Sequence, residues 1–515
     1  MLSVIRKLLC SIITCTCISL TASSAFALQT RARPRHRAAE QTKPAAAGPQ
    51  QQPAAVLGRA KTVLGFDRVT KPIMHYHAVA AAEQNYQSDR TYPPFFSAML
   101  IKEAWFDSRS GVERISAQTT FPGGGQFPVQ VSLTDAKRAF GLARDHLNPM
   151  PRASMESRYL NPWAVIADWA AAGNARFAGF ERYRDYPRIV LARATPGGDQ
   201  RLYVDPKTGF PVKLDIVEKH YLWGQRHIEY LYTNWVRSGA VVVPGSSFML
   251  ADGKTEISET IGDLEMIAQN ATPALELPAE PAESPDELPL FLRPLDPKVV
   301  QVGPKTYLLS NRGYTEAVTE AGNEIFLFDA TQGEERARKD SEAIASLFPG
   351  KHRVTVVVTD LAWPHIAGLR YWVASGATII GHSAAREFLQ GVVDRRWTLA
   401  PDLLERRRKT ARLRFVGVDG PYNLAGSQIS LHPIDGIGSE VALMAYVTAD
   451  RFLWASDYIQ TVDEPSLYAL EVWTAAQRDN LHPERTAAEH LPLTSWSKIE
   501  ELQKAAATGT APGAN

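Results

Sequence analysis

The feature that most constrains the fold is the stretch at residues 354–382, VTVVVTDLAWPHIAGLRYWVASGATIIGH. It opens with a β-branched run of the kind that forms a strand buried on both faces. Residues 369–373 carry apolar side chains at helical spacing, and residues 377–380 have the composition of a second short buried strand. Asp360 comes at the end of the first strand, where open α/β layers place their ligand sites. The stretch therefore predicts a strand–loop–helix–strand unit with a site beside Asp360.

Length and charge bound the class of protein. A chain of 515 residues with 45% hydrophobic composition is long enough for two domains with sizeable cores. Lys plus Arg number 56 and Asp plus Glu number 55, so the overall charge predicts neither nucleic acid nor an anionic membrane as partner.

The N-terminus has the pattern of a secretory signal peptide. Arg6 and Lys7 precede an apolar run at residues 8–20, and an A-x-A cleavage site ends at Ala27. Residues 1–27 are therefore predicted to be removed, which implies a periplasmic or secreted protein; a retained signal anchor is the alternative. All three cysteines fall within this segment, so the mature chain is expected to form no disulfide. No later apolar run is long enough to span a bilayer, so we expect no transmembrane segment after cleavage.

Composition divides the rest of the chain into five segments. Residues 28–54 are rich in Arg, Pro, Ala and Gln without periodicity, which predicts a disordered lead. Residues 55–270 are predicted to form a β-rich domain, and the Pro- and Glu-rich residues 271–294 a linker. Residues 295–503 are predicted to form a second domain, with strands at 299–310 and 324–329 and an amphipathic helix at 334–347, followed by a disordered tail at 504–515.

The clearest hairpin of the first domain lies at residues 202–212, where Asp205-Pro206 starts the turn and Gly209 supplies a positive φ. This run resembles the Y-x-D-x-x-T-G-x-P hairpin of lipoprotein-sorting-type carrier domains. The resemblance implies a curved antiparallel sheet cupping helices, with a lipid-like or apolar ligand on its concave side. Tyr and Trp residues at 221–235 either line such a pocket or form core pairs, and the second interpretation is favoured.

Two histidines of the first domain, His75 and His77, have the i, i+2 spacing of one strand face. Such a pair can bind a metal ion, but no third ligand is evident from the sequence. An ordinary pair of strand histidines is therefore the favoured interpretation.

Residues 358–369, VTDLAWPHIAGL, resemble the metallo-β-lactamase superfamily motif T-H-x-H-x-D-H-x-G-G-L. The resemblance implies an αββα sandwich for the second domain, and hence a fold class of α+β or α/β. In this alignment Asp360 and Ala362 stand at the first two His positions and Pro364 at the Asp position. Only the last His of the motif is present, as His365.

Later parts of the family pattern are recognisable as well. Asp457 matches the bridging Asp, and His490 within AEHLPLTSWS matches the last His. The remaining His position falls on Gly438 or Ser439, neither of which is a good ligand, and His432 lies too far upstream to match. Four of the seven family ligand positions are thus substituted, and the resemblance leaves His365, Asp457 and His490 as candidates for a single metal.

Two functional interpretations follow from this partial ligand set. Two imidazoles, one carboxylate and an open position form a known catalytic zinc set, and Asp360 would act as a further ligand or general base. The protein would then be a divergent metallo-hydrolase with at most one zinc-like ion, acting on an ester or lipid-like substrate. The alternative is a non-catalytic binding or scaffold protein, and the ligand losses favour a metal-free or weakly metallated site.

Overall fold

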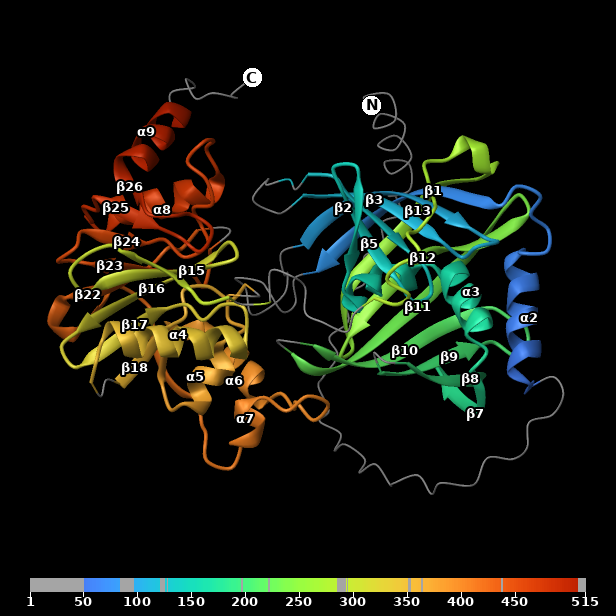
Figure 1. The fold of residues 1–515 in the computed structure, drawn as a ribbon, viewed down its shortest axis with the longest axis horizontal. Helices are drawn as coiled ribbons and strands as arrows, with labels where there is room; N and C mark the ends of the chain where they lie inside the picture. The colour runs from blue at the N-terminus through green and yellow to red at the C-terminus, as the bar shows by residue number, and fades with distance from the viewer. Residues whose placement is uncertain are drawn as a thin grey trace, which may run out of the picture. The chain divides into compact units, whose positions relative to one another are not determined.

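The structure is a computed structural model (Figure 1). It describes residues 51–83, 97–120, 126, 128–195, 198–220, 223–284, 293, 295–350, 353–362, 365–436 and 439–507. The predicted signal peptide, most of the predicted lead, and the motif positions Pro364 and Gly438 lie outside these residues. None of the helices in the described part of the chain combines the length and apolarity of a membrane span.

The first half of the chain forms one antiparallel sheet of thirteen strands. The strands are β1 (Ile73–Glu83), β2 (Ser97–Asp107), β3 (Glu113–Thr120), β4 (Gln130–Thr134), β5 (Ala139–Ala143), β6 (His146–Met150), β7 (Arg176–Tyr183), β8 (Tyr186–Thr195), β9 (Gly198–Val204), β10 (Pro211–His220), β11 (Gly224–Ser238), β12 (Val241–Ala251) and β13 (Lys254–Ile267). Their order is β6-β5-β4-β3-β2-β1-β13-β12-β11-β10-β9-β8-β7. Any two adjacent strands of this sheet are therefore consecutive in the sequence, except β1 and β13.

Two α-helices, α2 (Pro53–Leu64) and α3 (Pro162–Ala172), cover one face of this sheet (Figure 1). A single apolar core joins buried residues of both helices to the inward side chains of the strands. Asn161 caps α3 by accepting a hydrogen bond from the Trp163 amide. The helix α2 begins at Pro53, so the predicted disordered lead extends two residues too far; proline is favourable in the first turn of a helix. Short 3-10 turns are η3 (Arg152–Leu160) and η4 (Gln269–Ala271).

The predicted hairpin at 202–212 is confirmed as the turn between β9 and β10. The carboxylate of Asp205 accepts hydrogen bonds from the amides of Lys207 and Thr208 at 2.8 and 2.9 Å. Gly209 has a φ of 83°, which a side chain would disfavour. The local turn chemistry read from the sequence is therefore what fixes this register.

Aromatic residues of β11 belong to the core, in line with the favoured interpretation of that segment. Tyr230 and Tyr232 are buried, and the Tyr232 hydroxyl donates a hydrogen bond to the Tyr159 carbonyl at 2.7 Å. Trp235 stacks on Phe210 with ring centroids 4.6 Å apart. These side chains hold strands and helices together.

The described part of the predicted linker follows the edge of the first sheet. Arg138 donates a hydrogen bond to the Pro278 carbonyl at 2.7 Å, and buried Ser284 bonds both Lys137 and Ala139. Residues 272–284 contain no helix or strand but are attached by these bonds. The segment is thus more than a free spacer, and the domain boundary stays a prediction.

The second half of the chain forms two sheets. The seven-stranded sheet contains, in spatial and sequence order, β14 (Lys298–Gln301), β15 (Thr306–Asn311), β16 (Tyr314–Ala321), β17 (Glu324–Phe328), β18 (Arg353–Val357), β19 (Thr378–His382) and β20 (Arg414–Val418). The six-stranded sheet contains β21 (Tyr422–Leu424), β22 (Ile429–Pro433), β23 (Leu443–Val447), β24 (Phe452–Trp454), β25 (Arg485–Ala487) and β26 (Thr494–Ser495). One core of side chains from both sheets, including Phe328 and Trp454, lies between them.

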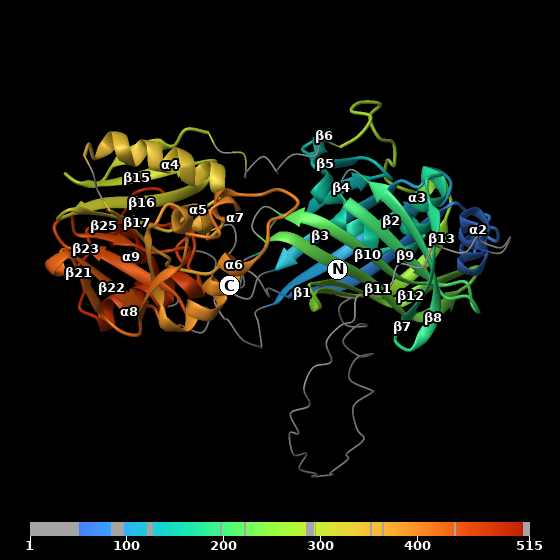
Figure 2. The same cartoon turned by 90° about the horizontal axis from the view of Figure 1, so that it is seen from below.

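Helices cover the outer faces of both sheets, which gives four layers (Figure 2). The seven-stranded sheet packs against α4 (Glu334–Leu347), α5 (Leu369–Ala374), α6 (Arg386–Asp394) and α7 (Leu403–Arg406). The six-stranded sheet packs against α8 (Leu467–Arg478) and α9 (Trp496–Ala507). Short 3-10 turns are η6 (Ser383–Ala385) and η7 (Ala425–Ser427). The predicted αββα order is therefore observed in the described residues.

Three details of the second half differ from the sequence prediction. Residues 299–310, expected as one strand, are two, because Gly303-Pro304 turns the chain between β14 and β15. The strand β16 was missed, since its Thr and Glu residues lack a clear apolar alternation. The predicted tail begins too early, because α9 continues to Ala507.

Candidate metal centre

The predicted site residues all follow the ends of strands in the αββα half. Asp360 and His365 follow β18, Asp457 follows β24, and His490 follows β25. In the seven-stranded sheet β17 pairs with β18 in parallel, and in the six-stranded sheet β24 pairs with β25 in parallel, so the strand ends of each pair lie at one edge of their sheet. Residues far apart in sequence thereby meet at one place.

The structure brings His365, Asp457 and His490 together, with one ligand atom of each within 4.8 Å of the others. His490 Nε2 lies 3.6 Å from Asp457 Oδ1, and the two imidazole centroids are 5.6 Å apart. Ligand atoms around a tetrahedral zinc ion, with bonds of about 2.1 Å, are about 3.4 Å from one another. The spacing of the His490–Asp457 pair is therefore close to that of a metal site.

The His490 ring is oriented by the backbone. Its Nδ1 donates a hydrogen bond to the Gly313 carbonyl at 2.8 Å, which assigns the proton to Nδ1 because a carbonyl can only accept. The lone pair of Nε2 then faces Asp457. Tyr314 packs edge-on against the ring at 4.7 Å. A histidine held through one nitrogen by a carbonyl, with the other nitrogen free to bind, is the usual arrangement at metal centres.

His365 is buried between two carboxylates. Its Nδ1 lies 3.1 and 3.2 Å from the two oxygens of Asp360, and its Nε2 lies 2.9 Å from Glu489 Oε2. Burial alone would lower the pKa of His365, but Glu489 and Asp360 outweigh it and raise the pKa well above its ordinary value. The His365 ring is therefore doubly protonated and positively charged when no metal ion lies beside it.

Asp360, predicted as a further ligand or general base, is held tightly in place. Its carboxylate accepts hydrogen bonds from the Ala362 amide at 2.7 Å and from the Ser456 hydroxyl at 3.0 Å. It is buried and lies against His365 Nδ1. This is the position of a carboxylate that orients a ligand histidine.

A second buried carboxylate, Asp329, holds the loop that carries Asp360. It accepts hydrogen bonds from the Thr359 amide and hydroxyl and from the Trp454 indole at 2.5 to 2.8 Å. Burial, followed by the nearby charge of Asp360, raises the pKa of Asp329 to about 7. The loop that carries Asp360 is therefore fixed to the sandwich core.

Glu489 was not predicted from the sequence. It is fully buried, and burial is the main cause that raises its pKa well above the ordinary value. The available signal was an acidic side chain immediately before the predicted ligand His490. Together, Asp360, His365 and Glu489 form a second group of potential ligands that shares His365 with the first.

Other polar residues considered from the sequence lie elsewhere in hydrogen-bonded pairs. His432 bonds Asp479 at 3.0 Å and Ser430 at 2.8 Å. The Ser439 hydroxyl donates to Glu471 at 2.7 Å. Neither is part of the groups above.

The donor set fits a single metal ion. His365 Nε2, His490 Nε2 and the Asp457 carboxylate provide two nitrogens and one oxygen, and Glu489 adds a second carboxylate. Glu489 Oε1 is buried and has no hydrogen-bond partner among the described residues, which is a costly state that a cation would relieve. Imidazole and carboxylate donors of this kind suit zinc and similar divalent ions.

A groove of about 650 Å³ opens beside His490. Gly313, Thr315 and His490 are among the residues that line it. The remaining wall is formed by Leu295, Asp296, Lys298, Val300, Leu308, Ser310, Asn311, Arg312, Pro492 and Leu493. The exposed surface of the groove is mainly apolar, and it carries two basic residues, Lys298 and Arg312, and one acidic residue, Asp296.

Comparison with known proteins shows that part of this chain is similar to solved protein structures. No family model and no curated protein matches the chain. A DIM-1 metallo-β-lactamase structure matches 42% of this chain and 100% of its own, at 11% identity and a TM-score of 0.33. A metallo-β-lactamase from Erythrobacter litoralis matches 41% of this chain and 97% of its own, at 14% identity and a TM-score of 0.33. Similarity at this level assigns neither a family nor an activity to the chain.

Proposed function

We propose that this chain is a metallo-hydrolase-like protein that binds one zinc-like ion through His365, Asp457 and His490, with Glu489 as an additional carboxylate. The observation that carries the proposal is the geometry of His490. Its Nδ1 is fixed by the Gly313 carbonyl, and its Nε2 faces Asp457 at 3.6 Å. An ordinary surface histidine needs no such orientation, whereas a ligand histidine does.

The protein's own residues have separate roles in this proposal. Asp360 holds the His365 ring by its Nδ1, so that Nε2 points toward Glu489. Gly313 does the same for His490. When bound, a zinc-like ion supplies Lewis-acid chemistry at the open end of the site.

A single ion is proposed because Asp360 and Ala362, at the first two His positions of the metallo-β-lactamase motif, provide no imidazole for a second ion. Ala362 has no ligand atom, and the Asp360 carboxylate is already occupied by the Ala362 amide, Ser456 and His365. A second ion at this edge would lack the nitrogen donors that zinc prefers.

The proposed substrate is an ester or lipid-like molecule. The groove beside His490 has apolar side chains such as Val300, Leu308 and Leu493 along its wall, suitable for an acyl chain. Lys298 and Arg312 can bind a carboxylate or phosphate on the same molecule. Export to the periplasm or the medium is part of the proposal and rests on the N-terminal signal pattern.

The second candidate is a non-catalytic binding protein, and it rests on His365. With a carboxylate at each nitrogen, the protonated ring supplies the positive charge that a metal would otherwise provide. The same groove would then hold a ligand without converting it.

Zinc titration of untagged protein tests the proposal, with His490→Ala as the variant and His482→Ala as the matched control. His482 is exposed, and its hydrogen bonds with the described residues Tyr446 and Arg451 use only its backbone carbonyl. We expect His490→Ala to lose one zinc equivalent, because His365 is then the single imidazole left in the site. The control should bind as the wild type does. Hydrolysis of p-nitrophenyl esters that falls with the lost zinc supports the hydrolase, and zinc binding without hydrolysis supports the binding protein.

A further inference from the structure

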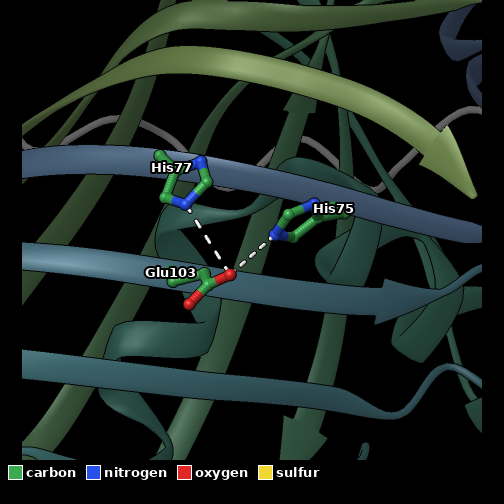
Figure 3. A group of neighbouring side chains, drawn as sticks. All are labelled: His75, His77 and Glu103. Atoms are coloured by element: carbon green, nitrogen blue, oxygen red, sulfur yellow. Dashed lines mark hydrogen bonds and ion pairs between the residues drawn. The ribbon is translucent and has the colours of Figure 1, made fainter. Parts of the chain in front are cut away.

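A second group of potential metal ligands lies on the antiparallel sheet of the first half. His75 and His77 lie on β1 and Glu103 on β2, with His77 directly opposite Glu103. Figure 3 shows the three side chains pointing toward one another across the two strands. Because strand residues alternate between faces, all three lie on the side opposite the core residues Tyr76 and Ala104. The third ligand that the sequence did not reveal therefore comes from the neighbouring strand.

The distances suit a shared cation. Glu103 Oε1 lies 2.9 Å from His75 Nε2 and 3.6 Å from His77 Nε2. These values bracket the separation of about 3.4 Å between ligand atoms of tetrahedral zinc. Shifts of a few tenths of an ångström would place the three atoms around one ion, and the side chains are exposed enough to move: His77 is 53% and Glu103 40% exposed.

The orientation of His75 is set from two further directions. Trp105 stacks on its ring with centroids 5.2 Å apart and planes 11° apart. Glu265, on β13, lies with its Oε1 3.4 Å from His75 Nδ1. A carboxylate at the far nitrogen of a ligand histidine is the usual outer support of a metal site.

His75 has a carboxylate at each ring nitrogen, Glu103 at Nε2 and Glu265 at Nδ1. A metal ion between Nε2 and the Glu103 oxygen is compatible with both contacts, because Nδ1 can then donate a hydrogen bond to Glu265.

We propose that His75, His77 and Glu103 bind a divalent transition-metal ion of the zinc class, with Glu265 as the positioning carboxylate. Two imidazoles and one carboxylate are the donors this class prefers, and the exposure of His77 leaves a coordination position open to water. The ion would link β1 to β2, because its ligands come from both strands. This site is independent of the one proposed at His490.

The test uses the untagged full chain in the His490→Ala background, which removes the other proposed site. We expect this protein to bind one zinc equivalent, and zinc to protect His75 and His77 from diethyl pyrocarbonate, as mapped by peptide mass spectrometry. Adding His77→Ala or Glu103→Gln should abolish both effects. Adding Glu265→Gln should weaken zinc binding by about tenfold. The control His146→Ala changes an exposed histidine on β6 and should leave both effects unchanged.

The outcomes separate the two proposals. If zinc fails to protect His75 and His77, or if His77→Ala binds as much zinc as its parent, the site on β1 and β2 is refuted. If His490→Ala binds as much zinc as the wild type, the function proposed above fails instead. Circular dichroism checks that each variant is folded, as we expect because His77, Glu103 and Glu265 lie on the face of the sheet opposite its apolar core.

Discussion

Replacing His365 by alanine in metal-free protein should destabilise the fold by about 3–5 kcal/mol, the usual cost of removing one partner from a buried ion pair. The side chain is only 4% exposed and lies between the carboxylates of Asp360 and Glu489. Its loss leaves both carboxylates buried without their cation. By contrast, His490 is 31% exposed and makes one hydrogen bond, to Gly313. His490→Ala should therefore cost only about 1 kcal/mol.

Urea unfolding in the presence of a chelator, followed by tryptophan fluorescence, measures this difference. His482→Ala is the matched control and should lie within about 0.5 kcal/mol of the wild type, because its side chain is exposed. A cost for His365→Ala no larger than that for His490→Ala would refute the reasoning. It would mean that the imidazolium does not hold the two carboxylates.

Three further predictions follow. Since His365 and Glu489 have raised pKa values in the folded protein, the folded state binds more protons than the unfolded state, and stability falls as pH rises. The loss in chelated protein should begin above the ordinary values, 4.5 for Glu489 and 6.5 for His365, and a urea midpoint that increases between pH 5 and pH 8 would contradict it. Asp360→Asn should weaken zinc binding by about 10- to 100-fold in a competition titration, because it loosens the His365 ring; unchanged affinity would remove Asp360 from its positioning role. The exported protein should begin at Leu28 by N-terminal mass analysis, and a retained Met1 would indicate an anchored protein.

Local patterns account for what could be predicted of the fold. The buried β-branched run at 354–358 and the amphipathic helix at 334–347 are found as β18 and α4. Turn chemistry predicted the β9–β10 hairpin. The strand β16 was missed because Thr and Glu are buried on it through hydrogen bonds, which a single sequence does not reveal.

The candidate sites could be predicted only in part, for a related reason. His365, Asp457 and His490 stand at motif positions, so a linear pattern suffices to select them. Glu489 and Glu103 acquire their roles from tertiary neighbours. Glu489 contacts a residue on another strand end, and Glu103 becomes the partner of His77 only through the register of β1 with β2.

Anomalous diffraction at the zinc absorption edge, from crystals of the zinc-loaded chain, tests the central claim most directly. We expect a peak at about 2.1 Å from both His490 Nε2 and an oxygen of Asp457, with His365 Nε2 completing the set. If no peak lies at these atoms while His365 keeps its contacts with Asp360 and Glu489, the ion is replaced by a proton and the metallo-hydrolase proposal is wrong.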